Sequence, residues 1–339
     1  MRQNSFRFVC LLFGLSFLGG EMKAQQKSAH ETGLRSKSTS ELAELEQVIT
    51  KVNYDESKVP VYTLPDVLTL TNGRKVTTKK EWVEKRRPEL LRLFETQIYG
   101  KAPVRSKDLH FRLLNEDREA LGGLATRKEV AVYLTKDEKH YLTVLMYLPN
   151  RRKGTVPMFF GINFKGNHAI HPDEGITFPS EERMIAYGRK RMFPRGSAAS
   201  RWPVEMLMEH GYGLATFYRG DIDPDFDDGF QNGVHPLYYK KGQTRPAEDE
   251  WGTLAAWAWG MSCAMDYFET DKDIDAKRIA IFGHSRLGKT TLWAGAIDPR
   301  FALVISNDSG CGGAALSRRK FGETVRAVNC QFTHWFCRN

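Results

Sequence analysis

The chain has 339 residues, of which 41% are hydrophobic and 12% aromatic. This composition excludes a disordered chain, a collagen-like chain and a coiled coil, and a chain of this length can bury a core without a disulfide framework. The formal net charge is +9, from 50 Lys and Arg against 41 Asp and Glu. The charges are interspersed, which favours a solvated surface with weak attraction for acidic polymers over a nucleic-acid binder.

The N-terminus has the pattern of a targeting segment. Arg2 and Arg7 precede a short apolar run from Phe8 to Leu18, and Gly19, Gly20 and then Met22-Lys23-Ala24 follow. This order is typical of a secretory signal peptide, here predicted over residues 1–24. The apolar run is too short to span a bilayer, and no other apolar stretch reaches about 18 residues. We therefore expect a secreted or periplasmic protein with no membrane-spanning helix.

The rest of the chain is predicted to be a polar leader, residues 25–60, followed by one domain over residues 61–339. Helical spacing of apolar residues predicts a helix over 78–97. The remaining predicted elements are three strands of an edge meander (109–114, 129–134, 141–148), four apolar strands (156–164, 212–218, 278–283, 301–306) and three helices (203–209, 249–268, 287–296). Alternating apolar strands and helices predict an α/β fold, a three-layer sandwich around a mostly parallel sheet.

The segment 219–248 differs from its surroundings because it is rich in aspartate and turn-forming residues. Closely spaced aspartates are compatible with a calcium loop, but the EF-hand spacing is absent, and a loop held by Asx turns is the favoured interpretation. No metal is expected.

Beyond the predicted signal peptide the chain has four cysteines, Cys263, Cys311, Cys330 and Cys337. None forms a CxxC pair, so the sequence does not support a zinc site or thioredoxin-like chemistry. An oxidising compartment permits disulfides among the four, and the sequence leaves their pairing open.

The motif Gly283-His-Ser285-Arg-Leu-Gly288 lies between an apolar strand and a predicted helix. A serine in this context is typical of a nucleophile elbow, a sharp turn that exposes the serine hydroxyl above the sheet. The helix N-terminus then offers N–H groups and a positive dipole to a developing oxyanion. The alternative is an ordinary glycine–serine turn at a helix N-terminus.

The same residues also match a P-loop pattern, because Gly283 is followed by Gly288-Lys289-Thr290 at the required spacing. We rank this interpretation second. The chain is expected to be exported to a place where ATP is scarce, and no later strand carries the acidic residue that binds magnesium in such proteins.

Several motifs together resemble the bacterial glucuronoyl esterases of carbohydrate esterase family 15. They are the segment 283–289, Ser306-Asn-Asp-Ser-Gly-Cys-Gly-Gly-Ala314, Arg318-Arg-Lys-Phe-Gly-Glu-Thr-Val325, Phe164-Lys-Gly-Asn-His168 and His334-Trp-Phe-Cys337. The resemblance runs from about residue 80 to the last residue. It implies an α/β-hydrolase fold, hydrolysis of esters between 4-O-methyl-glucuronic acid on xylan and lignin alcohols, and no metal or organic cofactor.

The resemblance also implies roles for individual residues. Ser285 would be the nucleophile, and the Arg286 side chain would help to stabilise the oxyanion. Lys289 and Glu323 would bind hydroxyl groups of the sugar. Asp308 falls where similar enzymes carry the acid of the triad, and it directly follows an apolar strand at the edge of the sheet where sites lie in such folds. The alternative for Asp308 is an Asx turn before Gly310.

The general base is the part of the pattern that the sequence does not supply. Downstream of Ser285 the only histidine is His334, which lies in the segment that precedes the last strands of the resembled family. We therefore expect His334 to be a structural or rim residue, and the domain to be incomplete at its C-terminus, without its last strands.

Three functions remain open at this point. The first is a glucuronoyl-esterase-type serine hydrolase that acts on glucuronoxylan or lignin–carbohydrate esters and is inactive if the base is missing. The second is a related carbohydrate esterase such as an acetyl xylan esterase, and the third is a non-catalytic carbohydrate-binding remnant. In each case a monomer is expected, with no nucleic-acid partner and no association with a membrane.

Overall fold

The computed structural model describes residues 52–186 and 192–339. The predicted signal peptide and most of the predicted polar leader lie outside these residues. In the part of the chain that is described, no helix is long and apolar enough to cross a membrane.

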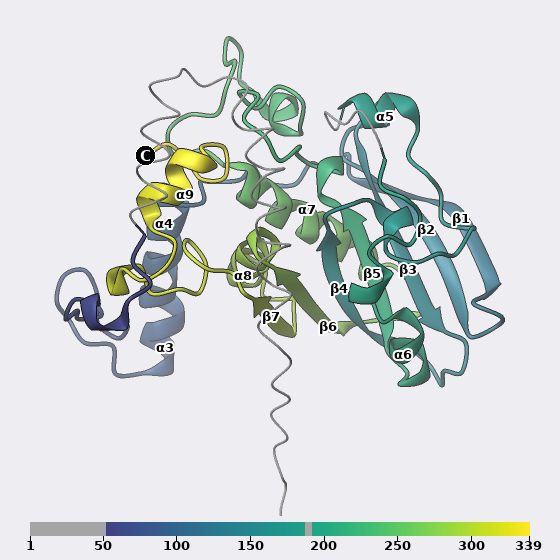
Figure 1. The fold of residues 1–339 in the computed structure, drawn as a ribbon, viewed down its shortest axis with the longest axis horizontal. Helices are drawn as coiled ribbons and strands as arrows, with labels where there is room; N and C mark the ends of the chain where they lie inside the picture. Colours follow the sequence, from purple (N-terminus) through teal and green to yellow (C-terminus); the bar gives the residue numbers. More distant parts are fainter. Residues whose placement is uncertain (1–51, 187–191) are drawn as a thin grey trace, which may run out of the picture.

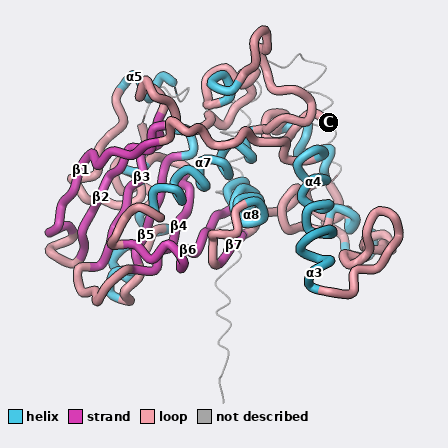
Figure 2. The backbone as a smooth tube through the Cα atoms, turned by 180° about the vertical axis from the view of Figure 1, so that it is seen from behind, coloured by secondary structure: helices cyan, strands magenta, loops and turns pink. Residues whose placement is uncertain are grey.

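The described residues form one seven-stranded sheet, which lies on the side opposite α3 and α4 in Figure 2. The strands are β1 (His110–Ala120), β2 (Ala125–Tyr133), β3 (Tyr141–Pro149), β4 (Val156–Asn163), β5 (Gly213–Tyr218), β6 (Ile274–His284) and β7 (Leu303–Asn307). Their order in the sheet is β1-β2-β3-β5-β4-β6-β7. The pairs β1–β2, β2–β3 and β3–β5 are antiparallel, whereas β5–β4, β4–β6 and β6–β7 are parallel. The antiparallel meander and the parallel half both lie where the sequence predicts them.

Helices cover both faces of the sheet, so the predicted three-layer sandwich is confirmed (Figure 1). On one face α7 (Thr253–Phe268) and α8 (Arg286–Ile297) pack on the strands and on each other. On the other face α6 (Val204–Glu209) and the segment that contains Ile170 and Ile176 bury a smaller apolar cluster. A further helix on that segment is α5 (Glu181–Ala186), and short 3-10 helices lie at Glu56–Lys58, Asn167–Ala169, Ala199–Arg201, Arg219–Asp221, His235–Tyr238 and Ser317–Arg319.

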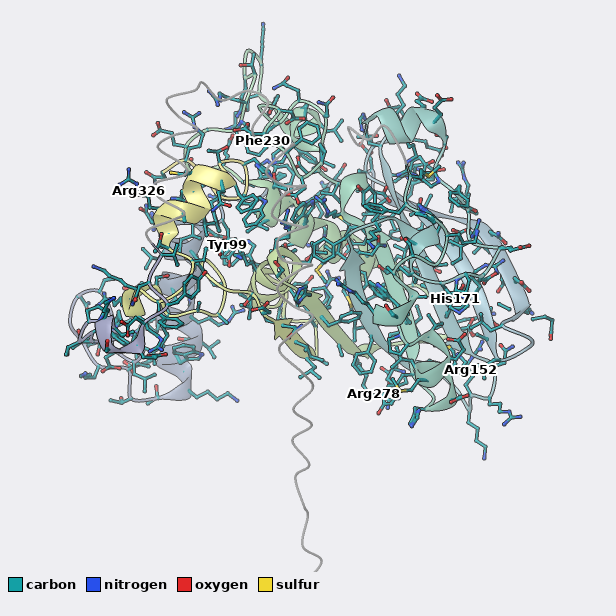
Figure 3. All side chains as sticks on the ribbon, in the orientation of Figure 1. Tyr99, Arg152, His171, Phe230, Arg278 and Arg326 are labelled. Atoms are coloured by element: carbon teal, nitrogen blue, oxygen red, sulfur yellow. The ribbon has the colours of Figure 1, made fainter. Side chains whose placement is uncertain are left out.

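A helical lobe stands beside α8, on the side away from the sheet (Figure 1). It consists of α3 (Lys79–Glu81), a π-helical stretch (Trp82–Arg86), α4 (Arg87–Gln97) and α9 (Val325–Gln331). The first three replace the single helix predicted over 78–97. The ring of Tyr99, labelled in Figure 3, stacks on Trp293 of α8 at 4.6 Å, and its hydroxyl donates to Gly312 O at 2.9 Å. Tyr99 therefore joins the lobe to α8 and to the chain that follows β7.

Strand β2 begins four residues earlier than the sequence predicts, because three consecutive charged residues are buried in it. Arg127 pairs with Asp173 at 2.7 Å. Lys128 lies 2.9 Å from both Asp271 and Asp273, and the Glu129 carboxylate accepts hydrogen bonds from Thr177. A run of charges normally indicates a solvated face, and only partners far away in the sequence make its burial favourable.

Strand β7 also differs from the prediction, which treated it as a fully buried apolar strand. Val304 faces α8, whereas Leu303 and Ile305 on the opposite face are 52% and 40% exposed. It is an edge strand of the described sheet, paired only with β6 among these residues.

The last residues of the predicted leader lie against the segment 318–322. Gly322 N donates to Asn53 O at 2.8 Å, Glu56 pairs with Arg319, and the rings of Tyr54 and Phe321 meet edge to face at 6.0 Å. These contacts show that residues 53–56 pack on the domain, although the domain boundary itself stays a prediction.

The buried Lys128 cluster gives a prediction about stability. We expect Asp271→Asn to lower the free energy of unfolding at pH 7 by about 2 kcal/mol, because Lys128 loses a buried charged partner. Hydrogen bonds from Tyr267 and Lys128 outweigh burial and lower the pKa of Asp271 from its ordinary value of 3.8. The stabilisation is therefore fully present above pH 4 and is lost as the pH falls through the pKa of the folded state.

Urea unfolding of wild type and variant at pH 7 and at about pH 2.5 measures this difference. A suitable control is Asp275→Asn, which removes a more exposed pair with Arg278, and its effect should stay below about 1 kcal/mol. Equal losses in the two variants, or a loss for Asp271→Asn that does not shrink in acid, would contradict the prediction.

Candidate active site

Ser285 lies on the turn that joins β6 to α8, at the edge of the sheet where all four parallel strands end. Its backbone has φ 56° and ψ −126°, a conformation that costs free energy for any residue with a side chain. Ser285 N donates to Asn307 O at 3.0 Å, which ties the turn to the end of β7. Helix α8 begins at Arg286, directly after the turn, so no phosphate-binding loop separates strand from helix as a P-loop requires.

Two glycines allow α8 to approach β6 and β7 this closely. A Cβ on Gly283 would lie 2.2 Å from Leu287 O, and a Cβ on Gly288 would lie 2.9 Å from Asn307 O. Both obstacles are backbone atoms, which cannot rotate away. The glycines that flank the serine are therefore required by the geometry of the turn.

Arg286 is the first residue of α8, and its guanidinium forms an ion pair with Asp225. Its central carbon lies 4.7 Å from the ring centroid of Trp335 and 5.2 Å from that of Phe332, and these two rings stack at 3.7 Å. Arg286 Nε has no hydrogen-bond partner among the described residues. Burial lowers the pKa of Arg286 to about 10, which leaves it charged at neutral pH.

Lys289 stands one turn further along α8, with its residue only 3% exposed. Lys289 Nζ and Glu323 Oε2 converge on Gly310, where a Cβ would lie 3.9 Å from the amine and 3.7 Å from the carboxylate. Burial lowers the pKa of Lys289, while the negative charge of Glu323 opposes that shift. Loss of water around the carboxylate raises the pKa of Glu323, although part of this residue remains exposed, and Lys289 and Arg286 oppose the shift.

Asp308 directly follows β7, with φ 47°, and its side chain is exposed. Its charge acts on both Lys289 and Glu323, so it lies close to them. No histidine is oriented by it among the residues that the structure describes. The five residues named from the resemblance therefore meet at one edge of the sheet, while their individual roles stay predictions.

His334 is buried and does not contact the serine hydroxyl. Its Nε2 lies 3.1 Å from Asp225 Oδ1, and its Nδ1 has no hydrogen-bond partner within the described ranges. Burial lowers the pKa of His334 to about 4, so the ring is neutral at neutral pH. The described contacts of the ring are with Asp225 and not with Ser285, and the structural role expected from the sequence stays a prediction.

Sequence reasoning gave no role to Asp225 and Trp335, which contact Arg286, or to Arg219, which shares Asp225 with it. Asp225 belongs to the aspartate-rich segment, where only a calcium loop or Asx turns were considered. Asx turns do form there, since Asp228 Oδ1 accepts from Phe230 N at 2.7 Å. Its place near Arg286 could have been inferred from its position in the chain, because Asp225 follows shortly after β5 and therefore lies at the same sheet edge as Ser285.

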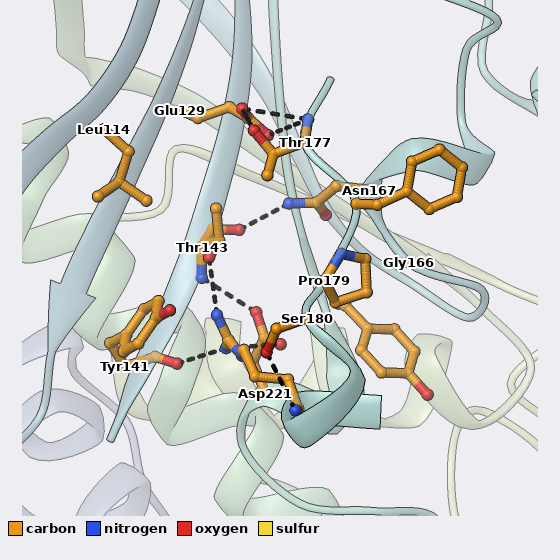
Figure 4. Close-up of a pocket in the computed structure, with 13 residues that line it drawn as sticks. Leu114, Glu129, Tyr141, Thr143, Gly166, Asn167, Thr177, Pro179, Ser180 and Asp221 are labelled. Carbon is orange, nitrogen blue, oxygen red and sulfur yellow. Dashed lines mark hydrogen bonds and ion pairs between the residues drawn. The ribbon is translucent and has the colours of Figure 1, made fainter. Parts of the chain in front are cut away.

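Two cavities lie near this edge. One, of about 1150 Å³, lies between the segment that contains Tyr54 and the segment that contains Cys311, Phe321 and Glu323. The other, of about 250 Å³, lies over β2 and β3 and is lined by polar groups that bond to one another, including Glu129, Thr177, Thr143 and Arg183 (Figure 4). The larger cavity adjoins the candidate site through Glu323, whereas none of the five candidate site residues lines the smaller cavity.

All four described cysteines are free thiols in this structure. Burial raises the pKa of Cys311, which lies beside Glu323. A thiol with a raised pKa is a weaker nucleophile at neutral pH, so Cys311 is a poor alternative to Ser285.

The comparisons with known proteins agree with this geometry. The family profile described as "Glucuronyl esterase, fungi" matches residues 206–336. The chain is 54% identical over 292 residues to carbohydrate esterase MZ0003 from an unknown prokaryotic organism, and the match covers 84% of this chain and 67% of that protein. Among solved structures, a glucuronoyl esterase from Solibacter usitatus is 45% identical with a TM-score of 0.77, covering 83% of this chain and 72% of that one.

A promiscuous CE15 esterase from a marine bacterial metagenome is 52% identical with a TM-score of 0.74, and the match covers 85% of this chain and 73% of that one. The chain spans about a third of the length of two fungal relatives named 4-O-methyl-glucuronoyl methylesterase 1. Identity above 50% to a relative of which two thirds is covered is decisive, and the protein belongs to the glucuronoyl esterases of carbohydrate esterase family 15.

Proposed function

We propose that the protein is a serine carboxylic-ester hydrolase that cleaves 4-O-methyl-glucuronoyl esters, the linkage between glucuronoxylan and lignin alcohols. The observation that carries this proposal is the strained turn at Ser285, directly followed by two largely buried cations, Arg286 and Lys289. The names of the relatives support the same substrate class, since they include glucuronoyl esterases and 4-O-methyl-glucuronoyl methylesterases.

The proposed chemistry follows from where the charges lie. Attack of Ser285 Oγ on the ester carbonyl places negative charge on the carbonyl oxygen. The N-terminus of α8 and the Arg286 guanidinium are both positive at this point and are fixed before the reaction begins, so they stabilise the charge without reorganising. Lys289, one turn further along α8, and Glu323, from the segment before α9, converge on Gly310 and are proposed to bind the hydroxyl groups of the sugar ring.

Asp308 is proposed as the acid that orients a general base. Among the described residues no hydrogen bond joins a histidine to the Ser285 hydroxyl or to Asp308, since His334 Nε2 is paired with Asp225 and His284 Nδ1 lies 3.1 Å from Asn307 Nδ2. No metal or organic cofactor is proposed. Secretion by a signal peptide over residues 1–24 and a monomeric state complete the proposal.

Chemical rescue by imidazole tests the nucleophile. We expect the protein to hydrolyse benzyl glucuronate slowly, because no described histidine is hydrogen-bonded to the Ser285 hydroxyl and removal of a histidine base typically costs about 10⁴-fold in rate. Added imidazole takes the serine proton and should accelerate hydrolysis in a concentration-dependent way, measured by release of benzyl alcohol. Ser285→Ala should abolish the imidazole-dependent reaction.

An acetylated xylan in the same assay separates the esterase classes. A glucuronoyl group offers hydroxyl groups to Lys289 and Glu323 that an acetyl group lacks, so we expect the glucuronate ester to be the better substrate by kcat/KM. Faster release of acetate would favour an acetyl xylan esterase. Sugar binding without any rescue would favour a carbohydrate-binding protein and contradict the proposal.

The role of Lys289 is tested by Lys289→Met, which keeps the length of the stem and removes the charge. We expect the dissociation constant for methyl glucuronate to rise about 10-fold or more, because a hydrogen bond from a charged group contributes about 1.5–3 kcal/mol. Calorimetric titration measures this. Lys320→Met is the matched control, since the exposed Lys320 borders the neighbouring cavity, and a similar loss in both variants would refute the role of Lys289.

A further inference from the structure

Asp225 is a buried carboxylate, its side chain 2% exposed, that contacts four side chains from three parts of the chain. Oδ2 forms ion pairs with Arg286 and, at 2.8 Å, with Arg219. Oδ1 accepts from Trp335 Nε1 at 2.8 Å and lies 3.1 Å from His334 Nε2. Each carboxylate oxygen therefore has two partners, and together the four contacts fix the position and orientation of the carboxylate group.

The partners of Asp225 are themselves held in place. Thr253 N and Leu254 N, at the start of α7, donate to His334 O at 2.9 Å and Trp335 O at 3.2 Å. The guanidinium of Arg219 lies over the ring of Trp257 at 5.5 Å. The carboxylate is thus anchored to α7 from two sides, whereas Arg286 belongs to α8.

We propose that Asp225 is a positioning residue, which orients the Arg286 guanidinium toward the oxyanion formed at Ser285. This inference rests on the proposed role of Arg286. The Arg286 side chain has several rotatable bonds. The rings of Trp335 and Phe332 keep the guanidinium close to them, but a cation–π contact does not fix the rotation of the guanidinium. The ion pair with Asp225 supplies the missing directional constraint, since guanidinium and carboxylate interact through directed N–H···O bonds.

The arrangement leaves Arg286 Nε without a partner among the described residues, while one Nη is committed to Asp225. A guanidinium held by one edge presents its other N–H groups in a fixed direction. Arg219 shares the Oδ2 atom, so the carboxylate also separates two cations that would otherwise repel each other in a buried site.

Asp225→Asn is the informative variant because it keeps size and shape and removes the charge. We expect kcat for benzyl glucuronate, measured with imidazole present, to fall on the order of 10²-fold, as when a catalytic group is displaced by about 1 Å. KM should change less than about twofold, because Lys289 and Glu323 remain. Asp225→Glu should recover part of kcat.

Asp227→Asn is the matched control. Asp227 lies on the same segment and accepts a hydrogen bond from Thr333 Oγ1, so it also joins this segment to residues near Trp335, but it does not contact Arg286. Its kcat should stay within about twofold of wild type. An equal fall of kcat in both variants would show that Asp225 only holds the segment in place and would overturn the inference.

A second measurement does not depend on activity. NMR of the arginine side chains reports rotation about the Nε–Cζ bond, which is slow when the guanidinium is held by a carboxylate. We expect slow rotation for Arg286 in wild type and Asp227→Asn, and fast rotation in Asp225→Asn.

Unchanged rotation in Asp225→Asn would overturn the inference even if hydrolysis were lost. Slow rotation in wild type that becomes fast in the variant, in a protein without esterase activity, would support the positioning contact and refute the proposed function alone.

Discussion

The close approach of α8 to β6 and β7 is the constraint on which the site depends. Gly283 and Gly288 have no room for a Cβ, and the obstacles are backbone atoms of α8 and β7. Any larger residue at these two positions would lift the helix away from the sheet. The turn at Ser285 would then relax, because its positive φ persists only where the surrounding structure holds it. The nucleophile, the helix N-terminus and both cations of α8 are therefore positioned by the same packing contact.

That packing creates an electrostatic problem. Arg286 and Lys289 occupy the first turn of a helix, where the macrodipole disfavours cations, and both are largely shielded from water. Asp225 and Glu323, which reach them from other segments, offset this cost, and the π face of Trp335 lies close to both cations. Positive charge that is unfavourable in the resting protein is favourable once an oxyanion forms, so the cost falls on the ground state and the benefit on the transition state.

Much of the fold could be predicted because it follows from local patterns. The apolar runs that became β4, β5 and β6 and the glycine–serine motif before α8 each carry their own signal, and their order gives the sheet its parallel half. Strand β2 shows where such reasoning fails: Arg127, Lys128 and Glu129 read as a solvated run, and their burial depends on partners up to 145 residues away. The same limit applies to Asp225. Its neighbours in the sequence suggest a turn-rich loop, and only the tertiary structure brings it to Arg286.

The position of His334 can be explained by the same contacts. Its carbonyl group and that of Trp335 accept hydrogen bonds from the first N–H groups of α7, which would otherwise be unsatisfied at a buried helix end. Gly252 permits this approach, since a Cβ there would lie 2.7 Å from Trp335 O. With its backbone capping α7 and its Nε2 directed at Asp225, the ring is fixed in place. Its Nδ1 has no hydrogen-bond partner among the described residues. The described contacts of His334 therefore hold Asp225 beside Arg286 and do not reach the hydroxyl of Ser285.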